Sequence, residues 1–447
     1  MSAAVRDAAE TSSPRRYARG RARRVEILDA AAALFADVGF GAVSLREIAA
    51  RVGISHQGLL RHFASKDEVL IALLDRYETE NAEWIESWLD AHTGSGSGSG
   101  SGSDENREAL FIALADRNDG IPGYVELFTA LAGEATSAEH PAHERFAARY
   151  AQLRELSVAQ FSSPVVAGLA AREIETVDEA VRLAAAWDGL QLQSLYEPDS
   201  VRVSDHLRAH FAWLVGDGSA ATAPGSGGKS TPGLPATSSA ASAWPADQTG
   251  DEPDASAGYA SGRARRDRIV DDAMDLFSRG GFTATSVQDV ADRVGITKSA
   301  LLYHFRSKDE LLLAVLQRRD RLGLAQVPAG TVTASRRLEL VVEGARHNTA
   351  TPGLVELYCV LAGESTNPGH PGHDFFRERF RGTRAFFAAT FTELIASGEL
   401  PESLDADREA AWLLALWDGL QFQWLYDRGS VDIAEQLSLH LAAVRTR

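Results

Sequence analysis

Apolar residues recur along most of this chain at intervals of three and four, the spacing that places them on one face of an α-helix. Near the start of each half, the pattern predicts a helix that ends at Gly39 or Gly281, because glycine readily adopts the left-handed conformation that follows a helix. No sustained alternation of apolar and polar residues indicates β-strands. The predicted fold is therefore all-α.

The pattern occurs twice. Residues 20–69 align without a gap on residues 262–311, and 27 of these 50 positions are identical. Two further matches pair the segments that begin at Pro122 and Pro352, and residues 187–196 with residues 417–426. A repeat of about 200 residues has the size of a domain or more, so the chain is predicted to be a fusion of two similar units.

Composition divides each unit further. We predict a disordered leader (1–13), a helix-turn-helix domain (14–66), a larger helical domain (67–215) with a flexible Gly-Ser tract (94–103), a linker rich in Pro, Gly, Ala and Ser (216–261), a second helix-turn-helix domain (262–308) and a second larger domain (309–447). Segments without core-forming residues are typical of flexible loops and linkers.

The helix-turn-helix prediction depends on capping residues. Ser44 with Glu47 has the spacing of a capping box before a helix predicted at 45–51, and Ser286 with Asp289 has it before 287–293. A turn at residues 52–54 or 294–296 precedes a second short helix, which is the arrangement that inserts into the DNA major groove. An αα-corner within a helical core would also explain one copy.

Charge favours the DNA-binding interpretation. The net charge of the chain is −17, but residues 14–66 carry ten Lys and Arg against four Asp and Glu, a net +6. Residues 259–308 carry nine against six, a net +3, so the remainder carries −26. This asymmetry separates a phosphate-facing surface from an acidic body.

Position on the two predicted helices selects the DNA-contacting candidates. In the first half they are Ser44, Ser55, His56, Gln57, Gly58, Arg61, His62 and Lys66; in the second half they are Ser286, Thr297, Lys298, Ser299, Ala300, Tyr303, His304 and Lys308. Flanking arginines, which supply attraction independent of base sequence, are Arg21, Arg23, Arg24, Arg263, Arg265 and Arg266.

Each half resembles the tetracycline-repressor (TetR) family of bacterial transcription regulators. The resemblance rests on a first helix that ends in Gly-Phe, the segments IAARVGIS and VADRVGIT, the Leu-x-x-His-Phe stretch of the second short helix, and Ser-Lys-Asp-Glu before the next helix. Family members commonly have tyrosine at the positions of Leu60 and Leu302, where it binds a phosphate. Arg61 and Tyr303, one residue later, are the candidates for that contact here.

The resemblance implies about nine helices per half and a repressor that a small-molecule effector releases from DNA. It also implies that the last two helices of each half pair as a four-helix bundle. The interface residues would then be Trp187, Leu190, Leu195, Phe211, Trp417, Leu420, Leu425 and Leu441. The expected pairing is between the halves of one chain, with a two-chain assembly as the alternative. The sequence does not assign the effector or its pocket.

The remaining features of the sequence argue against other classes of protein. A single cysteine, Cys359, and the lack of an apolar signal-like segment lead us to expect a cytoplasmic protein without disulfides. The pairs His140/His143 and His370/His373 flank prolines that mark a helix start, so no metal or other cofactor is predicted. No constellation indicates an enzyme. The alternative function is a ligand-sequestering or protein-interaction module whose helix-turn-helices are vestigial.

Overall fold

The computed structural model describes residues 14–93, 107–216, 257–323, 332–351 and 353–445, and every regular element within these ranges is an α-helix. The predicted all-α class is therefore confirmed. The predicted leader and Gly-Ser tract, and residues 217–256 of the predicted linker, lie outside the described residues. Among the described residues, no helix has the length and apolarity that a membrane span requires.

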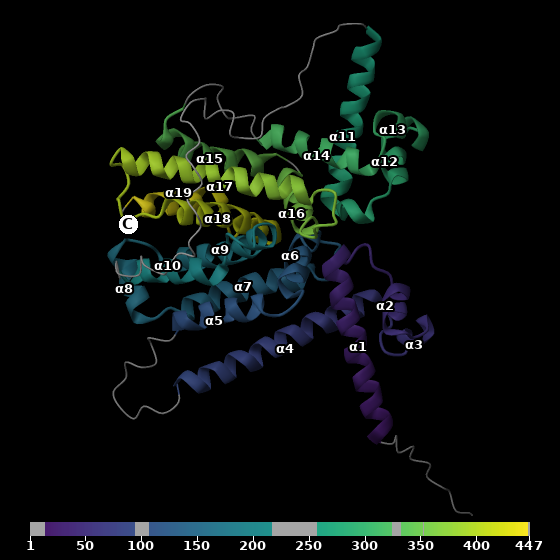
Figure 1. Cartoon of the computed structure of the whole chain (residues 1–447), viewed down its shortest axis with the longest axis horizontal. Helices are drawn as coiled ribbons and strands as arrows, with labels where there is room; N and C mark the ends of the chain where they lie inside the picture. Colours follow the sequence, from purple (N-terminus) through teal and green to yellow (C-terminus); the bar gives the residue numbers. More distant parts are fainter. Residues whose placement is uncertain (1–13, 94–106, 217–256, 324–331, 352, 446–447) are drawn as a thin grey trace, which may run out of the picture.

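The helices of the two halves follow the same order (Figure 1). The first three helices of each half form what we term its head, and the later ones its body. The first head contains α1 (Pro14–Val38), α2 (Leu45–Val52) and α3 (His56–Leu60); the first body contains α4 (Lys66–Thr93), α5 (Arg107–Asp119), α6 (Tyr124–Glu134), α7 (His143–Gln160), α8 (Ser163–Ala171), α9 (Thr176–Tyr196) and α10 (Val203–Val215). The second head contains α11 (Ala257–Ala284), α12 (Val287–Val294) and α13 (Lys298–His304); the second body contains α14 (Lys308–Gly323), α15 (Ala334–Ala350), α16 (Leu354–Glu364), α17 (His373–Ala396), α18 (Ala406–Tyr426) and α19 (Ile433–Val444).

A proline accounts for the additional helix of the first body. Ser162 accepts a hydrogen bond from the backbone N–H of Val165 and Pro164 lies in the first turn, so α8 begins separately after α7. The matched stretch of the second half has no proline, and α17 continues without a break to Ala396.

The helix ends of the heads follow the capping residues. Gly39 has φ 80° after α1, as predicted. In the second half the helical ribbon continues to Ala284, but Gly281 at φ 75° and ψ 170° interrupts it where an end was predicted. The helix α11 begins at Ala257, inside the predicted linker, and the linker contains no proline between Pro253 and its predicted end at residue 261. The capping boxes at Ser44 and Ser286 are both present, and α2 and α12 extend one residue beyond the predicted ends.

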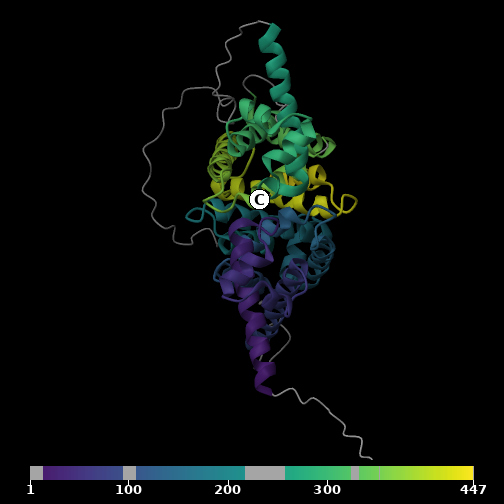
Figure 2. The ribbon, with the colours of Figure 1, turned by 90° about the vertical axis from the view of Figure 1, so that its right-hand side faces the viewer.

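The two bodies pack against each other mainly through α9 and α18, which cross near their middles (Figures 1 and 2). A Cβ atom at Gly189 would overlap with the carbonyl oxygen of Ala415, and one at Gly419 would overlap with that of Ala185. The backbones therefore approach so closely that only glycine fits at either position. The spacing of Ala185 to Gly189, repeated at 415 and 419, places two small residues on one helix face.

Matched hydrogen bonds surround this crossing. Gln193 Nε2 donates to the carbonyl of Ala411 over 3.0 Å, and Gln423 Nε2 donates to that of Val181 over 3.2 Å. At the ends of the two helices, Tyr196 donates to the carbonyl of Ala362 (2.6 Å) and Tyr426 to that of Ala132 (2.8 Å). These bonds give partners to polar groups that the contact removes from water.

The predicted interface residues lie around the crossing rather than at its centre. Trp187 packs against Phe111 of its own half, with 6.5 Å between ring centroids, and Trp417 lies beside Gly344 of its own half. Leu190 and Phe211 belong to an apolar cluster that includes Trp412 and Ala415 of the second half. The remaining four belong to, or pack against, the core that spans both halves: Leu195, Leu420, Leu425 and Leu441.

We predict that Gly189→Ala destabilises the chain by about 2–3 kcal/mol, because the added methyl group forces α9 and α18 apart. Gly382→Ala is the matched control, since a Cβ there has no neighbour within 4 Å and alanine favours the helix by about 0.5–1 kcal/mol. Urea unfolding midpoints of the full chain provide the measurement. Equal midpoints for the two variants would contradict the close crossing.

Candidate DNA-binding surface and effector pocket

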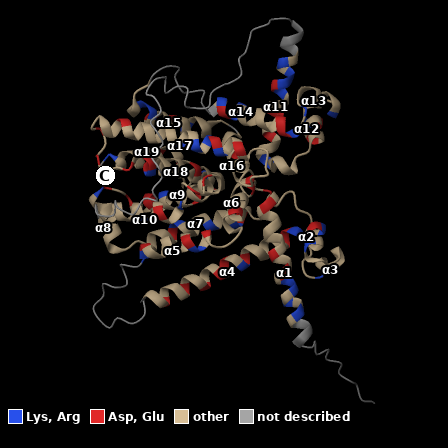
Figure 3. Ribbon diagram, in the orientation of Figure 1, with Lys and Arg blue, Asp and Glu red and all other residues tan. Residues whose placement is uncertain are grey.

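Both heads lie on the same side of the paired bodies (Figure 1). Viewed from that side, α1 and α11 extend toward opposite ends of the molecule (Figure 2). Lysine and arginine concentrate on the first parts of α1 and α11, whereas the bodies carry many acidic residues (Figure 3). The charge separation indicated by the sequence is thus also a separation in space.

The second helix of each helix-turn-helix is held by its cap and by two buried side chains. Ser55 accepts from the N–H of Gly58 over 3.0 Å, and Thr297 accepts from the N–H of Ala300 over 3.2 Å. Leu59 and Phe63 are completely buried, as are their counterparts in the second half. Gly53 and Gly295 both have positive φ, 72° and 76°, and give the turn before the helix.

The two outward faces differ in side chains and in helix length. The helix α3 has five residues and α13 has seven, so Tyr303 lies within a helix, whereas Arg61 caps the end of one. Tyr303 is 87% exposed. The other predicted contact residues on these helices are exposed or half-buried: Ser55, His56, Gln57, Gly58 and His62, and Thr297, Lys298, Ser299, Ala300 and His304.

Several basic side chains predicted to face DNA also have partners inside the heads. Arg24 lies 4.0 Å from the centroid of the Phe63 ring and donates to the carbonyl of His62, and Arg266 lies 4.3 Å from the Phe305 ring. Lys66 donates to the carbonyl of Phe40 over 2.8 Å. Arg24, Arg266 and Lys66 thus stabilise the heads themselves, which their positive charge alone did not indicate.

The remaining predicted contact residues differ in how far they are open to solvent. Lys308 resembles Lys66, since it donates to the carbonyl of Thr283 over 3.3 Å. Arg23 pairs with Glu26 over 2.5 Å on the surface. Ser44 and Ser286 are exposed and serve as the helix caps. Three flanking arginines are exposed and have no ion pair among the described residues: Arg21, Arg263 and Arg265.

A buried glutamate connects each body to its head. Glu134, the last residue of α6, accepts from the N–H of Phe40 (3.1 Å) and of Gly41 (3.3 Å) in the loop before α2. Glu364 of α16 accepts in the same way from the N–H of Phe282 (2.7 Å) and of Thr283. Burial, reinforced by the negative charge of Glu364, raises the pKa of Glu134 to about 7, and burial also raises that of Glu364. Neither glutamate is among the site residues predicted from the sequence, although both lie within the repeated segment Leu-Ala-Gly-Glu.

The histidine pairs lie beside these glutamates and contact the protein chain. His140 Nε2 is 3.8 Å from Glu134 Oε2, and its ring meets that of Phe40 edge-on at 5.0 Å. His143 Nδ1 lies 2.8 Å from the carbonyl oxygen of Ala135. In the second half the ring of His370 meets that of Phe282 edge-on at 5.1 Å, and His373 Nδ1 lies 3.0 Å from the carbonyl oxygen of Ser365 while its ring stacks on Tyr196 of the first half.

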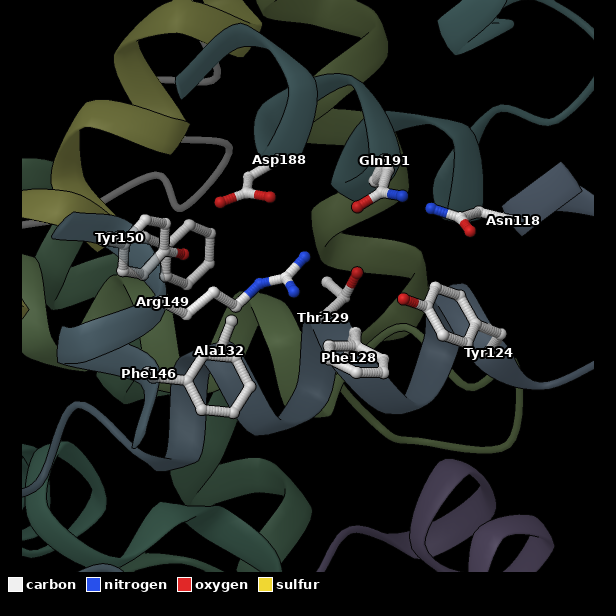
Figure 4. Close-up of a pocket in the computed structure, with 11 residues that line it drawn as sticks. Asn118, Tyr124, Phe128, Thr129, Ala132, Phe146, Arg149, Tyr150, Asp188 and Gln191 are labelled. Carbon is white, nitrogen blue, oxygen red and sulfur yellow. The ribbon is translucent and has the colours of Figure 1, made fainter. Parts of the chain in front are cut away.

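A small pocket of about 20 Å³, partly open to solvent, lies in the first body (Figure 4). Helices α5, α6, α7 and α9 supply its walls, and Phe422 reaches it from α18. The polar lining is Asn118, Tyr124, Thr129, Arg149, Tyr150, Asp188 and Gln191, and the apolar lining is Phe128, Ala132 and Phe146 together with Phe422. This volume holds about one water molecule and is far below that of a typical ligand site, so a small molecule could enter only if the surrounding helices moved apart.

Two capped helix-turn-helices on one side of a helical core define this protein as a DNA-binding transcription regulator. The comparison with known families agrees: the family model described as "Bacterial regulatory proteins, tetR family" matches residues 27–73 and again residues 269–315. A model of the BetI-type transcriptional repressor C-terminal domain matches residues 372–446. The chain belongs to the TetR family and contains two TetR units in tandem.

Relatives align with one unit at a time. The HTH-type transcriptional repressor KstR2 of Mycolicibacterium smegmatis is 28% identical over 196 residues, which cover 40% of this chain and 88% of that protein. The HTH-type transcriptional regulator TtgR of Pseudomonas putida is 26% identical over 38% of this chain and 83% of its own length. A solved transcriptional regulator from Saccharomonospora viridis, in complex with choline, aligns over 40% of this chain and 93% of its own with 25% identity and a TM-score of 0.34.

We predict that Glu134→Gln changes how stability depends on pH. Because the folded pKa of about 7 exceeds the ordinary 4.5, the stability that Glu134 contributes is fully present below pH 4.5 and is lost as pH rises to about 7. The wild type should therefore lose about 3 kcal/mol relative to the variant across this range. Thermal unfolding from pH 4.5 to 7.5 measures this change. The exposed Glu144→Gln is the control, and wild-type and Glu134→Gln curves that stay parallel would contradict the prediction.

Proposed function

We propose that this protein is a repressor in which the two halves of one chain form a pseudodimer on an imperfect inverted-repeat operator, and that a small-molecule effector releases it. The observation that carries the proposal is the pair of heads on one side of the joined bodies, each with a capped recognition helix (Figure 1). A dimeric operator requires two such helices on one face.

Differences between the halves at their contact support pairing within one chain. His210 stacks on Trp412 with 4.1 Å between ring centroids, and Arg182 Nη1 donates to Gln436 Oε1 over 3.2 Å. In the repeat, Trp412 is the counterpart of Arg182, so two first halves would bring His210 against an arginine. Joining unlike halves in one chain gives them an effective concentration of roughly millimolar.

The position of the pocket supports release by an effector. Thr129 and Ala132 of α6 line the pocket, and Glu134 ends the same helix with its hydrogen bonds to the first head. The helix α6 also packs closely against α16. The approach is so close that a Cβ at Gly133 would overlap with the backbone at Cys359. A ligand that displaces α6 would therefore shift one head relative to the other and weaken simultaneous binding to both half-sites.

The side chains proposed to contact bases differ between the two half-sites. Gln57 suits the N6 and N7 atoms of adenine, whereas Lys298 donates to the O6 and N7 atoms of guanine, each contact contributing about 1–3 kcal/mol of discrimination. Arg61 and Tyr303 are proposed to contact the backbone phosphates near the end of each helix. Fusion removes the requirement that both recognition helices be identical.

Selection from random DNA with the full chain tests the proposed function. The expected product is an inverted repeat whose two arms share a core and differ under α3 and α13, bound by a single chain of 48.1 kDa in sedimentation. Lys298→Ala should weaken binding by about 1–3 kcal/mol and relax preference in one arm only. Selection of a perfect palindrome would contradict the proposal that the two helices read different bases. Two chains on each operator would contradict the pseudodimer. If the selection enriches no sequence, the result favours the alternative in which the helix-turn-helices are vestigial.

The exposed arginines allow a separate prediction about salt. Replacing Arg21 and Arg263 by alanine should reduce the slope of log K against log [salt] by about 2, since each phosphate contact contributes about 0.9. The preferred sequence should stay the same, because backbone contacts carry no base information. Fluorescence anisotropy between 50 and 200 mM salt measures the slope. A changed base preference with an unchanged slope would show that these arginines read bases.

A further inference from the structure

The two heads touch each other at the middle of the molecule, where the ends of α1 and α11 come together (Figure 1). A Cβ atom at Gly41, in the loop before α2, would lie 3.2 Å from the Cβ atom of Ala284, in the loop before α12. This distance is shorter than most contacts between side-chain carbons. The loops therefore pack against each other because Gly41 has no side chain.

Charged side chains hold the loop of the first head on both sides. Its backbone N–H groups donate to Glu134, and the carbonyl oxygens of Phe40 and Gly41 accept from Lys66 Nζ over 2.8 and 3.3 Å. Hydrogen bonds to charged groups are among the stronger ones in proteins. The loop continues into α2 through Val43, which is 3% exposed. The position of α2 therefore follows that of Gly41.

The loop of the second head is held in the same way. Glu364 accepts from the backbone N–H groups of Phe282 and Thr283, and Lys308 Nζ donates to the carbonyl oxygen of Thr283 over 3.3 Å. The two carboxylates are close enough for the charge of Glu364 to reinforce the raised pKa of Glu134. The head–head contact thus joins two loops that are each fixed to their own body.

One further bond ties the first head to the second body. Asn367, which follows α16, donates through Nδ2 to the backbone carbonyl and to the carboxylate of Asp37 at the end of α1, over 2.7 and 2.6 Å. The repeat has Ser137 and Arg279 at the matched positions, and Arg279 pairs with Asp275 of its own helix over 2.7 Å. The bond between Asn367 and Asp37 therefore restrains the first head against the opposite half.

Fixed heads have a consequence for the DNA that can be bound. Two recognition helices on one face of a duplex require half-sites about one helical turn apart, or 34–36 Å. One additional base pair moves a half-site by about 3.4 Å and turns it by roughly 35° around the duplex axis. A head that is packed against the other head cannot follow this change unless the contact breaks.

We propose that the contact between Gly41 and Ala284 makes this protein specific for one spacing between the half-sites of a DNA duplex. Gly41, Ala284 and Asn367 are then positioning residues, which set the separation of the recognition helices without touching DNA. The specificity for spacing rests on the proposed function, whereas the fixed separation of the heads does not.

The second head supplies a suitable substitution for the test. Gly41→Thr gives the first loop the residue that the second loop has at the matched position, Thr283. The φ angle of Gly41 is not positive, so the new side chain causes no backbone strain, but it meets Ala284 and pushes the heads apart. The matched control is Gly20→Thr in the same head, since a Cβ atom there has no neighbour within 4 Å.

Affinity of the full chain is measured for the selected operator and for the same operator with one base pair inserted between its half-sites. The insertion should weaken wild-type and Gly20→Thr binding at least tenfold and Gly41→Thr binding no more than threefold. Asn367→Ser, which introduces the residue of the first half, should also reduce the loss. Wild-type affinity that changes less than threefold, or a Gly41→Thr variant with the wild-type loss, would overturn the proposal. Thermal unfolding checks each variant, and Asn367→Ser decides if Gly41→Thr does not fold.

The separation of the heads is measured without DNA. Nitroxide labels at Gln57→Cys and Ser299→Cys occupy matched positions on α3 and α13, and the chain without these cysteines is the labelling control, since Cys359 is 0% exposed. Double electron–electron resonance should give one narrow distance, which Gly41→Thr lengthens and Gly20→Thr leaves unchanged. A narrow distance in a chain that binds no DNA would refute the proposed function and leave the contact standing. A broad wild-type distribution in a chain that binds DNA would refute the contact alone.

Discussion

The crossing of α9 over α18 is the contact on which the rest of the structure depends. At Gly189 and Gly419 the two helix backbones meet without side chains between them, and Ala185 and Ala415 complete the contact. So close an approach fixes the relative position of the bodies and brings Tyr196 and Tyr426 within hydrogen-bonding reach of the opposite half. The apolar core continues through this contact, so the two halves share one interior.

The relative position of the heads follows from this arrangement through a second pair of helices. The helices α6 and α16 also touch at glycines, Gly133 and Gly363, and each ends in a glutamate that accepts backbone hydrogen bonds from its own head. The charges of Glu134 and Glu364 interact across the junction, and a buried carboxylate in this position is held by directed bonds rather than by apolar packing. The helix α6 therefore contacts the first head both through these hydrogen bonds and through its packing against α1.

Duplication allowed the two halves to diverge at sites where a homodimer must be identical. Arg182 and Trp412 occupy one position of the repeat, and they make different contacts across the interface. Phe128 and Tyr358 occupy another: the ring of Phe128 lies beside Arg149, whereas the ring of Tyr358 lies beside both Arg319 and Arg379. Arg61 and Tyr303 show the same divergence on the surface of the heads.

The local structure was determined by the sequence itself. The repeat, the all-α class, the capping boxes at Ser44 and Ser286 and the turn at Gly53 follow from residues close together in the chain, because caps and turns use backbone groups only a few residues away. At the start of the next helix, Ser65 accepts from the N–H of Glu68, and Glu68 accepts from the N–H of Ala64. The helix α4 begins at Lys66, directly after this cap.

Only the tertiary structure decided which residues meet at long range. The large apolar residues Trp187 and Trp417 were natural candidates for the interface, yet glycines form its centre, because small residues allow the closest backbone approach and leave no apolar signal in the sequence. Arg24 and Lys66 carry the charge expected of DNA contacts, but aromatic rings and carbonyl groups within the head hold them. The hydrogen bonds between Glu134 and the first head, and the pocket around Arg149, likewise bring together residues from separate helices. No local sequence pattern encodes the distances between these residues.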